Sequence, residues 1–418
     1  MKSFRPGDIK IHSMALWSLD RSRSVSNMLH LVKNIKIYES IMNPVLTAVF
    51  TIVDGIGLAE SFPLIGEEYI EMDIETPGMD DIFTMRFDII EIRDKQQIVD
   101  GKSSSYNLYC VSKEFRKNIR PINEIYPDAN PVEILQKLVT TLKTDKEFSA
   151  GEGVYAKVDF DLTGLRPLQA IDKVRMLTRN INESSSAFCF FENKHGFNFF
   201  SVEQLFKTGK TKIGDKVFFF DSATNRSIFE NNFRRIVGMS RLSDTAAMRG
   251  VFGGQLNAKM KTFDILTGEV SDKAYKDSES SAGFIYADDD SASLRSSSGQ
   301  VEDGEEPSAY LMNLIDSSKS DPAIHEMIME RSSYVHKLVQ QLYRIEIYGD
   351  LAINAGDVIE VNIPTSSGLT KGGDNEPLDR RYSGNFMVSR LVSNISLMGA
   401  TPVHSMTCEL IKGNLANG

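Results

Sequence analysis

Two segments far apart in the chain share a pattern typical of a half-buried β-strand. Ile70–Ile74 and Ile359–Ile363 both read Ile-Glu, an apolar residue, Asp or Asn, and Ile, which is the period of two expected of a strand with one buried face. Two more apolar strands follow each copy, around residues 87–93 and 106–113 and around 386–392 and 406–412. This shared order favours two related β domains. The alternative is two unrelated strands, because five-residue matches arise by chance.

Length and charge narrow the possible classes of protein. The 418 residues exceed what one core usually holds, so about two to four domains are expected. The net charge of -10 and a pI near 5.3 argue against a surface that grips nucleic acid, since such a surface needs clustered Lys and Arg. An acidic lining would instead let DNA pass without sticking.

The sequence predicts a protein kept in a reducing, cytoplasm-like setting. No apolar run approaches the roughly 20 residues of a membrane helix, and the first six residues lack the apolar core of a signal peptide. Cys110, Cys189 and Cys408 are too few and too scattered for a disulfide framework. We expect buried free thiols. Cys110 and Cys408 also fall in the third strands of the two copies, as if they were matched.

The N-terminal part reads as a meander of five strands. Asp54-Gly55, Pro77-Gly78 and Asp100-Gly101 mark its breaks, because Gly relieves the steric cost of tight turns. The expected strands are 34–40, 45–53, 69–75, 83–93 and 105–113. With one polar face, they predict a barrel or a sandwich.

The next part alternates helices and strands. Asn130-Pro131 starts a predicted helix, with Asn as cap and Pro at the first helical position. A second helix is expected over 167–181, and residues 187–191 and 196–201 resemble a hairpin. We therefore expect an α/β unit between the two β domains.

The acidic, serine-rich segment 271–307 has little to bury and is expected to be an exposed excursion. Asp321-Pro322 would then start a helix leading into a strand at 343–348. That strand opens the second β domain, into which the segment 228–241 could also pair.

Two local motifs resemble ligand-binding loops without meeting their requirements. Lys207–Thr211 resembles the end of a phosphate-binding loop, but Gln204 stands where the first Gly is needed. A solvated turn is expected there. Asp288–Asp290 lacks the alternating ligands, Gly and terminal Glu of a calcium loop, so a solvated acidic loop is favoured.

No catalytic, cofactor or metal site is predicted. His404 and Cys408 share one face of a predicted strand, but no second pair accompanies them, which disfavours zinc. The remaining histidines, each without a nearby nucleophile and carboxylate, are His12, His30, His195, His325 and His336. Any pair of carboxylates nominated for hydrolysis would be arbitrary. The sequence therefore predicts no enzyme and no bound cofactor.

Several longer runs resemble one family, the baseplate central hub proteins of contractile-tailed, T-even-like bacteriophages. The C-terminal runs are 349–351, 354–361, 363–364, 381–388 and 408–412, and the upstream runs are 126–129, 188–200, 250–252 and 263–264. The similarity extends over most of the chain and is weakest at 271–307. The chain shows no appended spike module after Lys412, unlike the fused spike proteins of type VI secretion.

The resemblance implies a structural role in the virion tail. It implies a homotrimer in which each chain supplies two tail-tube-like β domains, so that three chains form a pseudo-hexameric ring. Such a ring joins the six-fold tail tube protein to the three-fold central spike protein and leaves a channel for transient passage of DNA. The tape measure protein and the baseplate wedge are further candidate partners, with assembly in the host cytoplasm.

The expected fold class is α+β, mainly β, with two tail-tube-like antiparallel β-barrel or sandwich domains and α/β insertions. The expected segments are 1–117 (first β domain), 118–217 (α/β connector), 218–250 with 343–418 (second β domain), and 251–342 (insertion packing with the connector). Alternative functions are a tail-associated cell-wall hydrolase and a glycan-binding tail-tip protein. The first lacks a catalytic constellation, and the second would prefer exposed aromatic residues, whereas Trp17 is the only tryptophan.

Overall fold

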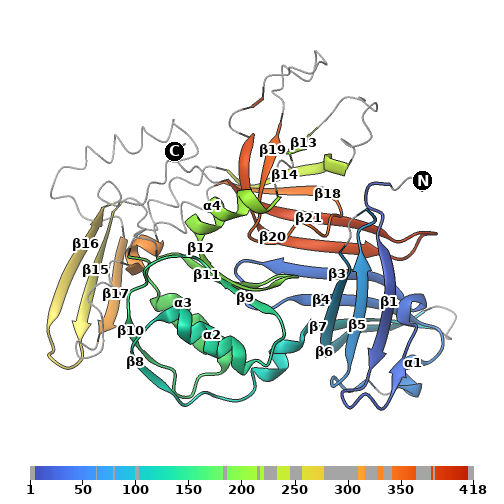
Figure 1. The fold of residues 1–418 in the computed structure, drawn as a ribbon, viewed down its shortest axis with the longest axis horizontal. Coiled ribbons are helices and arrows are strands. Elements are labelled where there is room, and N and C mark those ends of the chain that lie inside the picture. The colour runs from blue at the N-terminus through green and yellow to red at the C-terminus, as the bar shows by residue number, and fades with distance from the viewer. Residues whose placement is uncertain are drawn as a thin grey trace.

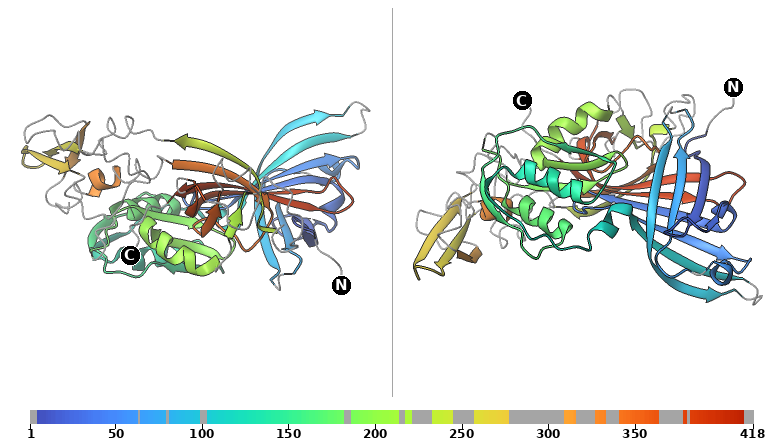
Figure 2. Two further views of the ribbon diagram at one scale, coloured as in Figure 1. Left: turned by 90° about the horizontal axis from the view of Figure 1, so that it is seen from above. Right: turned by 60° about the horizontal axis from the view of Figure 1, so that its bottom comes forward.

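The computed structural model shows a mainly β protein of the α+β class, built on one long sheet with an α/β segment beside it (Figure 1). In both views of Figure 2, the N-terminal strands fan out at one end, and the α/β segment lies between this fan and the small sheet at the other end. The structure describes residues 5–62, 64–78, 81–98, 103–181, 186–213, 217–220, 233–244, 257–276, 309–315, 327–332, 341–363, 378–379 and 382–412. Within them, no helix has the length and apolar character that crossing a membrane requires.

The N-terminal part forms an antiparallel β unit with the strand order β3-β4-β7-β6-β5-β1. Its strands are β1 (Lys10–Trp17), β3 (Val32–Ser40), β4 (Thr47–Asp54), β5 (Tyr69–Glu75), β6 (Phe83–Gln97) and β7 (Ser104–Ser112), with the short β2 (Ser24–Val25) beside β1. The connections carry η1 (Met28–His30), α1 (Leu58–Ser61) and η2 (Lys113–Lys117). Alternate residues such as Ile70, Met72 and Ile74 are fully buried in one core. The five predicted strands are confirmed, but they do not form a simple meander, because β4 pairs with β7 and not with β5, the next strand in the sequence.

The local sequence pattern does not predict strand β1. Its residues Met14 and Leu16 are buried and alternate, but polar residues occupy the strand's first half. β1 pairs with β5, so that Met14 lies opposite Met72. Pairing between segments this distant in sequence gives no local signal, which is why the pattern alone did not identify the strand.

The C-terminal part forms a second β unit with the strand order β14-β18-β21-β20-β19-β13. Its strands are β13 (Val217–Phe219), β14 (Ile236–Asp244), β18 (Gln341–Tyr348), β19 (Val358–Asn362), β20 (Gly384–Ser396) and β21 (Val403–Lys412). All neighbours are antiparallel except β13 and β19. Two predictions are confirmed: β18 begins this part of the sheet after the insertion, and the upstream segment pairs with it as β14.

The two β units share one continuous sheet, because β20 of the second unit pairs with β3 of the first. The pairing is antiparallel and runs from Arg390 opposite Ser40 to Ser396 opposite Asn34. Ile395 near the end of β20 is fully buried in the core of the first unit. The units are therefore joined by backbone hydrogen bonds as well as by side-chain packing.

The α/β segment lies between the two β units in the sequence. It contains β8 (Ile125–Ala129), α2 (Pro131–Thr141), β9 (Glu147–Ala150), β10 (Val158–Asp161), α3 (Pro167–Leu177), β11 (Phe188–Glu192), β12 (Gly196–Ser201) and α4 (Val202–Ile213). Helices α2 and α3 pack over an aromatic core in which Phe188 and Phe199 stack with ring centroids 5.1 Å apart. The predicted helix start is confirmed, since the Asn130 side chain accepts a hydrogen bond from the Val132 amide at 2.9 Å. The predicted hairpin is β11–β12.

A small three-stranded sheet forms a separate layer at the far end of the molecule (Figure 1). It consists of β15 (Asn257–Asp264), β16 (Val270–Lys276) and β17 (Ala309–Ile315). A helical turn at 327–332 contacts the α/β segment, where Arg331 donates to the carbonyls of Ser186 and Met176. The division of the chain into four segments at residues 117, 217, 250 and 342 stays a prediction.

Two local expectations are wrong. The segment Lys207–Thr211 is part of helix α4, not a solvated turn, because Val202, Leu205 and Phe206 bury one face of that helix. Likewise, the predicted excursion 271–307 begins as strand β16, which is paired with β15. The rest of that segment, the acidic run Asp288–Asp290 and the predicted helix start at Asp321 lie outside the described residues.

The cap of α2 gives a direct test of the fold. We expect Asn130→Ala to lower the free energy of unfolding by about 1 kcal/mol, because the Val132 amide loses its acceptor. Asn130→Asp is the matched control and should stay near the wild-type value, since Asp caps equally well. Equilibrium denaturation measures both variants, and equal losses would contradict the capping role.

Candidate functional site

The side chains that attracted attention in the sequence do not converge on one site. His404 and Cys408 both lie buried on the same face of β21. His12 contacts Glu75 at 2.5 Å, and His195 meets the Phe83 ring edge-on. His325 and His336 lie outside the described residues. In the part of the chain that the structure describes, no three His, Cys, Asp or Glu side chains gather as a metal site requires.

The three cysteines are buried free thiols, as expected. Burial raises the pKa of the Cys189 and Cys408 thiols to about 12 and also raises the pKa of Cys110. A thiol that stays protonated is a poor nucleophile. These cysteines therefore serve packing.

His404 is a buried histidine in a tight site. Its ring lies so close to Gly349 that a Cβ at that glycine would come within 2.0 Å of it. Neither ring nitrogen has a hydrogen-bond partner among the described residues. Burial, with a smaller contribution from nearby Lys194, lowers the pKa of His404 to about 3, while Asp350 acts in the opposite direction. The imidazole is therefore neutral in the folded protein.

This burial makes stability depend on pH. The unfolded chain binds a proton at His404 below pH 6.5 and the folded chain does not, so stability falls as the pH drops from 6.5 towards 3. At pH 4.5 this proton binding lowers the free energy of unfolding by about 3 kcal/mol. We expect His404→Leu to abolish this loss. Denaturation at pH 7 and 4.5 measures it. The control His30→Leu removes an exposed histidine and should keep the wild-type change in unfolding free energy between the two pH values. If His404→Leu also kept the wild-type change, the pH dependence would not come from His404.

A buried ion pair lies where three parts of the chain meet. Lys194, in the β11–β12 turn, lies 2.8 Å from Glu39 of β3, and both side chains are 1% exposed. Lys194 also donates to the Ile353 carbonyl at 2.8 Å, and Glu39 accepts from the Ala355 amide at 3.3 Å. The pair therefore connects the first β unit, the α/β segment and the loop between β18 and β19.

A second buried cluster ties the α/β segment to the first β unit. Lys146 contacts Glu192 and lies 3.2 Å from Glu114. Glu192 also accepts from the Leu46 amide at 2.9 Å and the Ser112 hydroxyl at 2.6 Å. Burial raises the pKa of Glu192 despite Lys146. Hydrogen bonds on both carboxylate oxygens compensate for its removal from water.

No sequence pattern predicts the buried roles of Glu39, Lys194 and Glu192. Charged residues in a strand or a turn are normally exposed, and nothing in the local pattern marked these as exceptions. Their partners come from elements far apart in sequence, so only the tertiary structure identifies them.

The Lys194–Glu39 pair can be tested by a double-mutant cycle. We expect Lys194→Met to cost about 3–5 kcal/mol in unfolding free energy, because it leaves a buried carboxylate unpaired. Adding Glu39→Gln should recover most of that loss. The control is Lys10→Met at the exposed Lys10–Glu75 pair, where a much smaller loss is expected because water screens the interaction. Equal losses at the two lysines would contradict the structural role.

The two β units match in detail, beyond their common strand order. Ile70 of β5 lies opposite Phe87 of β6, and Ile359 of β19 lies opposite Phe386 of β20. Both long strands then carry an irregularity three residues further on, between Ile89 and Glu91 in β6 and between Val388 and Arg390 in β20. The sequence repeat is thus confirmed as a repeat of strand order, register and first bulge over five strands. The sixth strands differ, since β1 is antiparallel to β5 and β13 is parallel to β19.

Both copies carry a cysteine in the third strand, as the sequence indicates, but the two cysteines occupy different positions. Cys408 lies opposite Leu391. The equivalent pair in the first unit is Leu108 opposite Ile92, so Leu108 is the counterpart of Cys408. The position of Cys110 is instead that of Leu410, because these residues lie opposite Ile89 and Val388. The two cysteines therefore lie in equivalent strands but not at equivalent positions. Cys110 lies two residues further along its strand than Leu108, the counterpart of Cys408.

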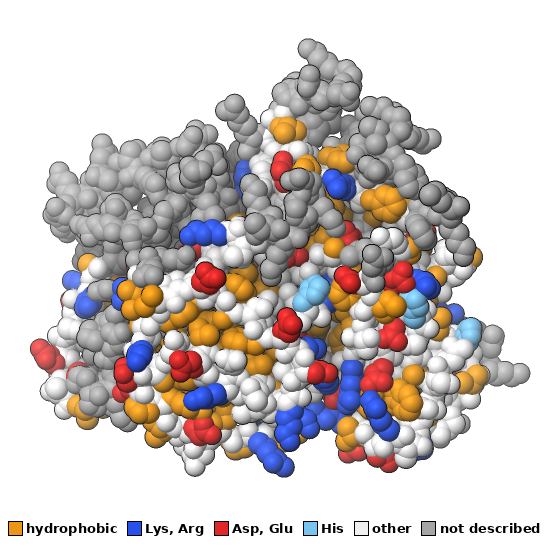
Figure 3. Space-filling model, viewed as in Figure 1, with side chains coloured by type: hydrophobic (Ala, Val, Ile, Leu, Met, Phe, Trp, Pro, Cys, Tyr) orange, Lys and Arg blue, Asp and Glu red, His pale blue; other side chains and the backbone are white. Residues whose placement is uncertain are grey.

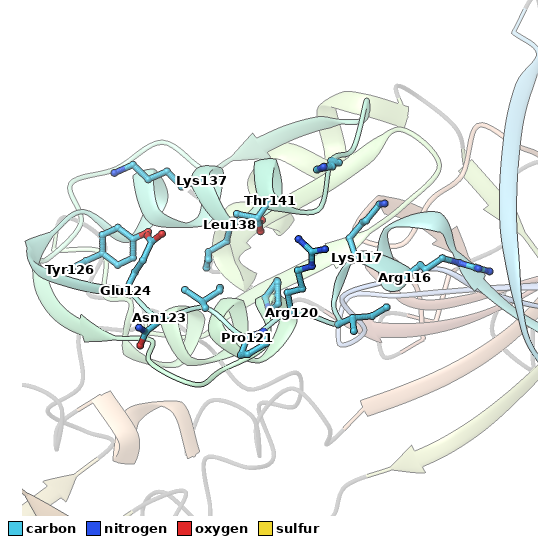
Figure 4. A pocket seen from close by; sticks show the side chains of 14 residues that line it. Arg116, Lys117, Arg120, Pro121, Asn123, Glu124, Tyr126, Lys137, Leu138 and Thr141 are labelled. Atoms are coloured by element: carbon cyan, nitrogen blue, oxygen red, sulfur yellow. The ribbon is translucent and has the colours of Figure 1, made fainter. Parts of the chain in front are cut away.

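A basic hollow of about 860 Å³ lies between the η2–β8 connection and helix α2 (Figure 4). Its cationic lining residues are Arg116, Lys117, Arg120, Lys137 and Lys143. Glu124 is the only carboxylate in the described lining, and it accepts a hydrogen bond from Tyr126. A lone, bonded carboxylate does not provide the pair that glycoside hydrolysis uses. The charge of the hollow suits contact with an acidic partner.

Acidic and basic side chains are interspersed over the described part of the face in Figure 3, with apolar side chains between them. Exposed apolar residues occur on both β units, including Ile90 and Ile98 of the first and Val237 and Leu242 of the second. Exposed apolar side chains in groups are typical of surfaces that contact a partner.

Over nearly its whole length the chain resembles solved phage tail proteins. A tail protein from Neisseria meningitidis MC58 matches with a TM-score of 0.55 at 12% identity, covering 96% of this chain and 97% of that chain. The 43 kDa tail protein of prophage MuSo2 from Shewanella oneidensis matches with a TM-score of 0.51 at 7% identity, covering 96% and 97%. The chain has the fold of phage tail proteins. This confirms the resemblance seen in the sequence at the level of the fold.

A weaker likeness, with a TM-score of 0.45 at 10% identity, is to an E. coli component of the type VI secretion system; it covers 96% of this chain and 76% of that chain. No protein-family model matches the sequence, and a search of curated proteins finds no significant match.

Proposed function

We propose that this protein is the structural hub of a phage tail baseplate. In this role it is a homotrimer whose six β units form a pseudo-hexameric ring between the six-fold tail tube protein and the three-fold central spike protein. The tape measure protein and the baseplate wedge are further contacts. The protein acts in the virion after assembly in the host cytoplasm, and it has no enzymatic role.

The observation that supports this proposal is the repeat of the β unit within one chain. The strand order β3-β4-β7-β6-β5 recurs as β14-β18-β21-β20-β19, and β20 and β3 join the two copies edge to edge. Two similar units per chain give six similar positions in a three-fold ring. A single chain can therefore present three-fold symmetry on one side and near six-fold symmetry on the other.

The ring encloses a channel through which DNA passes during ejection. The net charge of -10 supports an acidic channel wall, because like charges keep DNA phosphates from adhering. DNA contact is then transient, without a stable nucleic-acid complex. A map of the assembled ring that reveals a basic lumen would contradict this part of the proposal.

Native mass measurement tests the ring. We expect the purified protein, alone or with its spike partner, to give about 140 kDa for three copies of the 46.8 kDa protomer, plus the spike where present. The three-fold spike should bind one trimer and no other stoichiometry. A strict monomer under both conditions would count against the hub. A peptidoglycan digestion assay on the same sample should remain negative.

A further inference from the structure

Strand β20 is forked, because its two halves pair with different neighbours on one edge. From Gly384 to Met387 it pairs with β19. From Arg390 to Ser396 it pairs with β3 of the first β unit. The opposite edge of β20 pairs with β21 along its length. The second half of the fork is thus the junction between the two units.

Strand β6, the counterpart of β20, has the same fork with one branch unfilled. From Phe83 to Asp88 it pairs with β5, and its other edge pairs with β7 as far as Gln97. Beyond the bulge, the edge from Glu91 to Gln96 adjoins no other strand of the described chain. Gln97 is exposed and Ile92 is half-buried there, whereas the equivalent Ile395 and Leu391 of β20 are fully buried.

Strand β14 is the counterpart of β3, the strand that fills the fork of β20. Val32 of β3 lies opposite Ile52, and a bulge precedes Asn34. In the same way, Ile236 of β14 lies opposite Ile347, and a bulge precedes Gly238. β3 pairs on both edges, with β4 and β20, while β14 is the terminal strand of the sheet and pairs with β18 alone among the described strands.

We propose that the distal half of β6 pairs antiparallel with β14 of a second copy of this chain, reproducing the internal β20–β3 junction between subunits. This inference rests on the proposed trimeric hub and specifies its subunit contact. Each chain then offers one open fork and one strand to fill a fork, and no strand of the described part of the same chain pairs with either edge.

The internal junction also gives the register of the contact. Asn394 lies opposite Lys36. Asn394 corresponds to Gln96, because they face Ser405 and Ser105 in equivalent strands. Lys36 corresponds to Ser240, because they face Val49 and Arg344 in equivalent strands. Gln96 should therefore lie opposite Ser240 of the neighbouring chain.

The chemistry of the two edges is compatible with this register. Next to the Gln96–Ser240 pair, the bulge at Asp94 and Lys95 lies opposite Arg241 of the neighbouring chain. The Asp94 carboxylate and the Arg241 guanidinium would then lie close together. Exposed apolar residues flank both edges, with Ile90 on β6, Ile98 directly after it, and Val237 and Leu242 on β14. Burying them on association would be favourable.

The contact is heterologous, since different surfaces of two identical chains meet. Such contacts close into rings when the rotation between neighbours allows it. If the subunit contact repeats the internal junction, every β unit is related to the next by the same step. A closed ring then leaves neither edge open, which removes the risk of uncontrolled strand association.

Disulfide trapping tests the contact and its register. We propose to co-express Gln96→Cys and Ser240→Cys chains with different tags and to oxidise the purified trimer. The three native cysteines are buried and should not interfere. We expect a covalent heterodimer of twice the protomer mass, formed only when both variants are present. The double variant Gln96→Cys, Ser240→Cys should give covalent trimers.

Two controls set the specificity of the result. Glu91→Cys with Ser240→Cys places a thiol on the same exposed edge about 15 Å out of register, and we expect at least a tenfold lower yield. The second control places Asn394→Cys and Lys36→Cys in one chain, at the equivalent position of the β20–β3 junction. Protection of both thiols from maleimide then measures how much disulfide forms within the chain.

The native mass of each variant separates this inference from the proposed function. A trimer that links Gln96→Cys to Ser240→Cys and not Glu91→Cys supports the contact. A trimer without the link, or with equal yields for both pairs, overturns the contact and leaves the trimeric hub intact. A monomer overturns both.

Discussion

The antiparallel pairing of β20 with β3 is the contact on which the arrangement of the molecule depends. It turns two separate β units into one sheet and places Ile395 of the second unit in the core of the first. β20 can make this contact because it is much longer than its neighbour β19. The surplus length leaves an edge of hydrogen-bonding groups that another strand must satisfy.

Buried charges fix the α/β segment at the same junction. Glu39, which pairs with Lys194, lies on β3 opposite Leu391 of β20. The ion pair thus lies on the seam between the units, and its backbone contacts reach the loop before β19. Ion pairs of this kind contribute little net stability. Their value lies in geometry, since the charges are satisfied in one relative placement of the three parts.

In the proposed hub, a repeated unit joined by a repeated contact would let a single chain serve two symmetries. The unit supplies the tube-like surface, and the junction supplies the step from one unit to the next. In the proposed hub, half of these junctions join the two units of one chain, and the other half join units of neighbouring chains. The charged residues Glu91, Arg93, Asp94 and Lys95 along the open edge of β6 would keep the isolated subunit from associating out of register.

The sequence by itself determined the local features. Alternation of apolar residues located β5 and β19, and the Asn130 cap located α2, because these signals depend on neighbours a few residues away. Only the tertiary structure decided which edges pair, which is why β1, the Lys194–Glu39 pair and the true counterpart of Cys110 escaped the sequence analysis. Strand partners, bulges and buried charge pairs are set by contacts between segments far apart in the chain. A two-residue shift in register leaves the apolar pattern unchanged and yet changes every partner.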